Sequence, residues 1–207
     1  MWEHMTKMNK LKIAWISNIT FEPYLHTSLN EVFQKEQLQV EVIYYSYEEY
    51  LKTGADADVD CIGIYINLDT LFPNAILDIL NDPPLSEEYK SVALSLFQKI
   101  HLLSKQHRNC PLIWFGLEDY CFQNDATFGT MPKMNGLVDK INLNLIQLLN
   151  DDVFIDMKRL IANVGIKSAY NSKGKYRWNA PYSKELIEQI SIEVYKAYLR
   201  NTGHTKK

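Results

Sequence analysis

Two polar residues, Ser17 and Asn18, end the apolar run 12–16 and stand shortly before Pro23, which suits the first turn of a helix. A buried strand that ends in this way presents hydroxyl, amide and backbone N–H groups at the carboxyl edge of a parallel sheet. Ser17 is therefore a candidate nucleophile, and Asn18 is a candidate substrate-binding residue. The alternative is that the pair only caps the helix that follows.

Polar residues also follow the later apolar runs 60–66, 111–115 and 153–155. The candidates for substrate binding are Asn67, Asp69, Glu118 and Asp119, and Asp156 is a candidate catalytic residue. The carboxyl ends of parallel strands share one edge of a sheet, so these side chains are expected on the same edge as Ser17, with Asp119 and Asp156 farther along it. Asp69 and Asp156 could instead cap the helices that follow them.

Residues 166–182 have no apolar periodicity, so the sequence predicts a loop that returns to the sheet edge. Arg177 stands among aromatic residues in this loop and could hold a carboxylate or phosphate in a bidentate manner. The neighbouring aromatic residues are expected to pin the loop to the core; they are Tyr170, Tyr176, Trp178 and Tyr182. The nearby lysines could meet an anion or form a solvated face.

Nucleophilic acyl transfer by Ser17 requires a general base, and the sequence places no histidine after a predicted strand to serve as one. His26 falls in the first predicted helix, His101 and His107 in a long one, and the other two histidines near the chain ends. The sequence has no glycine-rich dinucleotide loop, no P-loop and no cluster with metal-ligand spacing. It therefore predicts no cofactor and no metal.

Five apolar strands alternate with helices, which predicts an α/β fold. The strands are expected at 12–16, 39–45, 60–66, 111–115 and 153–155. We predict a three-layer α/β/α arrangement with a five-stranded parallel sheet of flavodoxin-like order 2-1-3-4-5. The switch point then lies between the first and third strands, so Ser17, Asn18, Asn67 and Asp69 border one crevice. Residues 121–134 are expected to form a loop before a helix that opens at 135–136.

The chain has 207 residues, 46% of them hydrophobic, which fits one domain over 11–200 with a lead-in at 1–10 and a tail at 201–207. A formal charge of -3 argues against nucleic acid as a partner. The absence of a long apolar segment argues against a membrane span. Three cysteines without a pairing pattern fit a reducing compartment, so we expect a cytoplasmic protein.

The segment 12–25, KIAWISNITFEPYL, resembles the opening of FkbH-like proteins, whose amino-terminal half is an SGNH-hydrolase-like domain. Further similar segments follow in that family's order: Leu68-Asp69, 115–118, 142–144, 154–156 and 177–183. The resemblance covers about residues 11–200. It implies a role in natural-product biosynthesis, on acyl or glyceryl intermediates bound to an acyl carrier protein.

In the family, phosphatase chemistry resides in a carboxyl-terminal domain of the haloacid-dehalogenase type, and this sequence contains no such domain. The resemblance therefore implies a separate partner enzyme of that type. It places Ser17 at the position of the SGNH serine. The last block aligns Arg177 with the acid and Ala180 with the histidine, so the usual Ser-His pair is not retained.

The expected function is thus that of an FkbH-related domain acting on carrier-bound acyl or small phosphorylated substrates. A first alternative is a non-catalytic docking domain for a carrier protein or a phosphatase, which the replaced histidine favours. A second alternative is an esterase or acyltransferase with an unusual base, such as a carboxylate, the substrate itself or His26.

Overall fold

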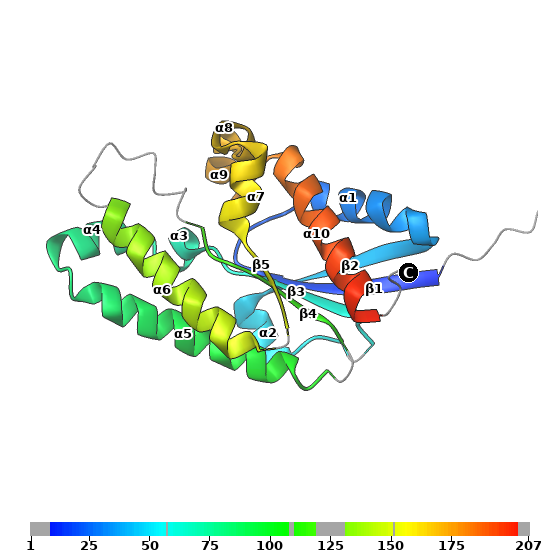
Figure 1. Cartoon of the computed structure of the whole chain (residues 1–207), viewed down its shortest axis with the longest axis horizontal. Helices are drawn as coiled ribbons and strands as arrows, with labels where there is room; N and C mark the ends of the chain where they lie inside the picture. The colour runs from blue at the N-terminus through cyan, green and yellow to red at the C-terminus, as the bar shows by residue number, and fades with distance from the viewer. Residues whose placement is uncertain (1–8, 57, 108–109, 119–130, 151, 203–207) are drawn as a thin grey trace, which may run out of the picture.

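The computed structural model describes residues 9–56, 58–107, 110–118, 131–150 and 152–202. Its sheet has the order β2-β1-β3-β4-β5, and every neighbouring pair of strands is parallel (Figure 1). The strands are β1 (Asn9–Ser17), β2 (Leu38–Ser46), β3 (Cys61–Tyr65), β4 (Leu112–Phe115) and β5 (Val153–Ile155). The predicted strand order is confirmed, and all five predicted strands are present.

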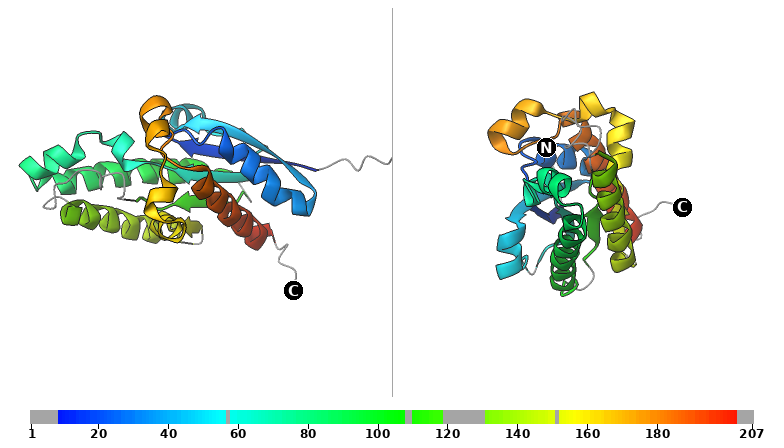
Figure 2. Two further views of the ribbon diagram at one scale, coloured as in Figure 1. Left: turned by 90° about the horizontal axis from the view of Figure 1, so that it is seen from above. Right: turned by 90° about the vertical axis from the view of Figure 1, so that its left-hand side faces the viewer.

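Helices cover both faces of the sheet. One face carries α1 (Tyr24–Phe33), α7 (Met157–Val164), α8 (Ile166–Ala169) and α10 (Lys184–Thr202), with the short 3-10 helix η1 (Gln34–Glu36) after α1. The other face carries α2 (Tyr47–Thr53), α3 (Leu68–Leu71), α4 (Ala75–Asn81), α5 (Leu85–Ser104) and α6 (Met131–Leu149). Figure 2 shows α1 beside α10 and α5 beside α6, which completes the predicted three layers.

The first strand is buried on both sides because it contributes to two cores. Ile13 and Trp15 face the core formed with α1 and α10, whereas Ala14 and Ile16 face the core formed with α5 and α6. This alternation explains why the strand reads as one continuous apolar run rather than an amphipathic one. It also fixes the direction of Ser17, which continues the row of Ile13 and Trp15.

The predicted loop at 166–182 is wrong, because the structure has α8 and a further helix, α9 (Ser172–Trp178), in this segment. The Asn171 side chain caps α9 by accepting a hydrogen bond from the Gly174 N–H at 2.9 Å. At the other end Asn179 adopts a left-handed conformation, with φ of 51°. Helices of four and seven residues are too short to display an apolar period, which is why the pattern suggested a loop.

The helix expected from 135–136 is α6, and it begins earlier, at Met131. The first ten residues of the predicted loop 121–134 lie outside the described residues. Two of the expected lead-in residues belong to β1, and two of the expected tail residues belong to α10. In the described part of the chain, no helix has an apolar stretch long enough to cross a membrane.

Candidate functional site

Ser17 is the last residue of β1 and lies in register with Ser46 of β2 and Tyr65 of β3. Its side chain is largely buried, at 7% exposure, and its Oγ accepts a hydrogen bond from the Ile19 N–H at 3.1 Å. Helix α1 begins after Pro23 with no side-chain cap. The alternative that Ser17 and Asn18 cap this helix is therefore wrong, because the serine stabilises the turn that leaves the strand instead.

A cavity of about 500 Å³ opens beside Ser17. It is lined by Trp15, Ser17, Asn18, Ile19, Thr20, Phe21, Glu22, Tyr44, Tyr45, Ser46, Tyr47, Glu48, Thr70 and Asn179. Two carboxylates line it, and no histidine, lysine or arginine is among these described lining residues. Burial and the nearby Glu22 carboxylate raise the pKa of Tyr44, so this phenol keeps its proton. The cavity is aromatic and acidic, which suits an uncharged or cationic group better than an anion.

Asn18 and Asn67 connect the ends of β1 and β3. The Asn18 side chain donates to the Asn67 carbonyl at 2.8 Å and accepts from the Asn67 N–H at 2.7 Å. Asn67 in turn caps α3, where its Oδ1 accepts from the Thr70 N–H at 2.9 Å. Both predicted binding residues thus hold the sheet edge together. Asn18 lines the cavity, whereas Asn67 is buried and does not line it.

Glu118 is the centre of a buried polar network on this edge. Its carboxylate accepts hydrogen bonds from Tyr65 at 2.6 Å, from Tyr182 at 2.5 Å and from the Asn67 side chain at 3.2 Å. The two tyrosine hydroxyls also contact each other. Glu118 lies at the sheet edge where the sequence pattern put it, but it is only 3% exposed and does not line the Ser17 cavity. Glu118 therefore stabilises the carboxyl edge of the sheet through hydrogen bonds in the protein interior.

Asp69 and Arg177 do not line the cavity. Asp69 lies in the first turn of α3 and forms an ion pair with Lys175 of α9. Arg177 is exposed on α9, where its guanidinium lies 5.9 Å from the ring centre of Trp178. Asp119 lies outside the described residues. Within the segment 177–183, Asn179 lines the cavity, although the sequence pattern did not single it out.

Asn179 ties α9 to the turn after β1. Its carbonyl accepts from the Thr20 N–H at 2.8 Å, and its side chain donates to the Asn18 carbonyl at 2.9 Å. The expectation that the aromatics of this segment pin it to the core holds only in part. Tyr182 is buried, whereas Tyr176 and Trp178 are 85% and 64% exposed. The helical geometry of α9 directs these last two side chains outward.

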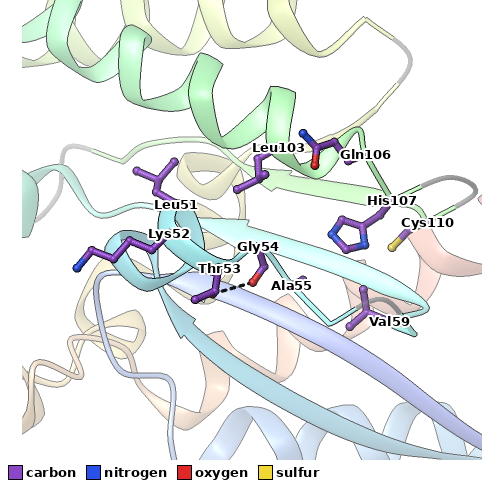
Figure 3. Close-up of a pocket in the computed structure, with 10 residues that line it drawn as sticks. All are labelled: Leu51, Lys52, Thr53, Gly54, Ala55, Val59, Leu103, Gln106, His107 and Cys110. Carbon is purple, nitrogen blue, oxygen red and sulfur yellow. Dashed lines mark hydrogen bonds between the residues drawn. The ribbon is translucent and has the colours of Figure 1, made fainter.

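The described histidines lie away from Ser17. His26 is on α1 with its Nε2 3.1 Å from the Val40 carbonyl oxygen, and His101 is on α5 with its Nδ1 3.5 Å from Asp152. His107 lines a second cavity, of about 600 Å³, with Val59 and Cys110 (Figure 3). These residues precede β3 and β4, so this cavity lies at the amino edge of the sheet, opposite Ser17. In the described part of the chain no group of three or more potential ligands is placed to hold a metal ion.

Asp156 follows β5 and caps α7, because its side chain accepts from the Arg159 N–H at 3.2 Å. We expect Asp156→Ala to lower the free energy of unfolding by about 1 kcal/mol, as loss of a helix cap does, and Asp156→Asn to be nearly neutral. Chemical denaturation measures both. A catalytic role would show instead as a loss of activity in the asparagine variant, whose stability is preserved.

No protein-family model matches the chain, and no curated protein matches its sequence. Among solved structures, the chain is similar to the N-terminal part of the protein BF1531 from Bacteroides fragilis, described as containing a phosphatase domain and complexed with Mg. The identity is 17% and the TM-score 0.70, over 97% of this chain and 54% of that one. The chain therefore spans about half the length of that structure.

Two further structures are similar. One is a lipase/acylhydrolase from Enterococcus faecalis, with 12% identity and a TM-score of 0.55 over 92% of this chain and 96% of that one. The other is the salicylyl-acyltransferase SsfX3 from a tetracycline biosynthetic pathway, with 14% identity and a TM-score of 0.50 over 96% and 56%. Together they confirm that the chain has an SGNH-like α/β fold, as its sequence resemblance implied.

Proposed function

We propose that the chain is an FkbH-related, SGNH-like domain that handles acyl intermediates in natural-product biosynthesis, delivered by an acyl carrier protein and shared with a separate partner enzyme. The observation that carries the proposal is the position of the Ser17 hydroxyl, at the end of β1 on the wall of a cavity of about 500 Å³. The structural likeness to an acyltransferase and an acylhydrolase supports this reaction class.

The residues that line the cavity restrict the chemical class of substrate that it can bind. Glu22 and Glu48 contribute carboxylates, and the described lining has no cation to balance a phosphate or carboxylate group. An uncharged acyl chain is therefore favoured over a phosphorylated glyceryl unit, because an anion would be repelled by these groups. The tyrosines of the lining offer apolar rings to such a chain.

In the proposed reaction, the Ser17 oxygen attacks the carbonyl carbon of an acyl thioester. The new bond joins serine oxygen to the acyl carbon, the carbon–sulfur bond breaks, and the thiol leaves. The serine proton passes to a carboxylate of the cavity and then to the departing sulfur. Glu22 and Glu48 are the available acceptors, since no described histidine lines the cavity.

The test is covalent labelling of Ser17 by a fluorophosphonate and by an acyl thioester, followed by intact-protein mass spectrometry. We expect one adduct on the wild-type chain and its complete loss in Ser17→Ala. Ser91→Ala is the matched control, because Ser91 is an exposed serine on α5 whose hydroxyl donates to the Glu87 carbonyl of its own helix. An adduct that persists in Ser17→Ala, or none on the wild type, would contradict the proposal.

A second candidate function is a non-catalytic docking domain for a carrier protein or a phosphatase. Two observations favour it: no imidazole among the described residues lines the cavity, and the Ser17 hydroxyl already accepts the Ile19 N–H. This function requires stable binding of a partner without labelling of Ser17 and without turnover of activated esters. The alternative with His26 as base has no support, because that ring contacts the Val40 carbonyl.

A further inference from the structure

One segment of the chain is strongly cationic although the whole chain is acidic. Between Asp156 and Glu185 there are seven lysines and arginines and not one aspartate or glutamate. They are Lys158, Arg159, Lys167, Lys173, Lys175, Arg177 and Lys184. Since the formal charge of the chain is -3, the rest of it is correspondingly more acidic. The segment forms α7, α8 and α9, which cluster together in Figure 1.

Part of this charge is neutralised within the protein. Lys158 pairs with Asp139, Lys175 with Asp69 and Lys184 with Glu188. For Arg159, Lys167, Lys173 and Arg177, the described residues provide no ion-pair partner, and all four are exposed. Four cations thus face solvent on three consecutive short helices, where they can attract an anionic surface.

Large apolar side chains are exposed among these cations. Tyr176 and Trp178 project from α9 with 85% and 64% of their surface accessible, and Ile166 of α8 is 44% exposed. Tryptophan, tyrosine and arginine are the residue types that contribute most to protein–protein binding. We call Ile166, Lys167, Lys173, Tyr176, Arg177 and Trp178 the α8–α9 patch.

The patch is connected to the rim of the Ser17 cavity by hydrogen bonds and an ion pair. Asn179 follows Trp178 directly, lines the cavity and bonds to both Asn18 and Thr20. Lys175, one turn earlier, is paired with Asp69 of α3. A partner bound to the outer side of α9 would therefore lie beside the cavity mouth.

We propose that the α8–α9 patch is the docking surface for an acidic protein, the carrier that presents its tethered acyl group to the Ser17 cavity. This inference rests on the proposed function for the identity of the cargo. Charge complementarity argues for the acidic surface, and the exposed tryptophan and tyrosine supply apolar anchors within it.

An anionic membrane would also attract cations and exposed aromatics, but the geometry favours a protein. Glu22 and Glu48 line the same cavity as Asn179, so acidic groups border the patch. A flat bilayer that reached α9 would bring its phosphates toward these carboxylates. A folded partner can contact the patch alone and leave the acidic mouth open to its substrate arm.

The test is binding of a purified acidic acyl carrier protein from the same organism, with its phosphopantetheine arm, measured by calorimetry and by tryptophan fluorescence. We expect Lys173→Glu with Arg177→Glu to weaken binding at least about 10-fold and to reduce its salt dependence. Trp178→Phe, made in a Trp2→Phe background, is expected to remove most of the fluorescence change, because the two tryptophans that then remain, Trp15 and Trp114, are buried. Lys35→Glu with Lys99→Glu makes the same charge change on other exposed helices and should leave binding unchanged.

Fluorophosphonate labelling of Ser17 separates the two proposals. If the patch variant is still labelled but no longer binds the carrier, docking at the patch is supported. Equal binding by the patch variant and the wild type overturns the inference, whatever the state of Ser17. Absence of any carrier binding overturns it too, as does attachment to phosphatidylglycerol vesicles that depends on Trp178 while the carrier protein does not bind.

Discussion

Replacing Glu118 with alanine is expected to lower the free energy of unfolding by about 3–5 kcal/mol, because it leaves several buried hydrogen-bond donors without their shared acceptor, at about 1–3 kcal/mol each. The change removes the acceptor that Tyr65, Tyr182 and Asn67 share, at 2.6, 2.5 and 3.2 Å. All three groups lie in a buried environment where water cannot replace the lost oxygen atoms at low cost. Urea or guanidinium denaturation followed by circular dichroism measures the loss.

Two further variants show whether hydrogen bonding or packing is responsible. Glu118→Gln keeps one acceptor oxygen and nearly the same volume, so it should lose clearly less stability than Glu118→Ala. Tyr182→Phe removes one donor and keeps the ring, which packs against Phe21. Combined with Glu118→Ala, it should cost less than the sum of the single changes, since both act on one network. Full additivity would show that the network is not a unit.

The sheet could be predicted from the sequence because each strand has a local sequence signal. Each strand is a short apolar run bounded by turn residues, and the right-handed crossover rule limits how such strands can be ordered. The position of Ser17 at the carboxyl edge follows because this residue ends the first apolar run. Helices α10 and α2 also have local signals, because Ser183 and Gly54 lie at their ends.

The contacts of the site were not predictable, because they join residues that are far apart in the chain. Tyr65 appeared as one more apolar residue of a buried strand, yet its hydroxyl reaches Glu118 and Tyr182. Arg177 was expected at the sheet edge because its segment was interpreted as a loop. Asn171, whose side chain can cap a helix start, and Asn179, which tolerates a left-handed conformation, were the local signs that α9 exists.

The second large predicted effect on stability comes from the close approach of β1 and β3. Gly63 of β3 is in register with Trp15 of β1, and a Cβ atom at Gly63 would lie 2.6 Å from the Trp15 ring. The ring cannot move aside, because Phe21 and Phe115 pack against it with centroid distances of 5.0 and 5.3 Å. We expect Gly63→Ala to lower the free energy of unfolding by about 3 kcal/mol, the upper part of the usual range for overpacked cores. Denaturant unfolding of the purified variant measures it.

The same substitution at Gly136 is the control, because no described atom outside its own stretch of α6 lies within 4 Å of a Cβ there. Gly136→Ala should raise stability by about 0.5–1 kcal/mol through helix propensity, so the two alanines act in opposite directions. Trp15→Leu should relieve the clash and make Gly63→Ala less costly in the double variant than alone, a coupling of about 1 kcal/mol or more. If Gly63→Ala costs as much in the Trp15→Leu background as in the wild type, the cause is loss of strand geometry rather than contact with the ring. The size of the coupling therefore reports how tightly the indole fixes β1, the strand that presents Ser17 to the cavity.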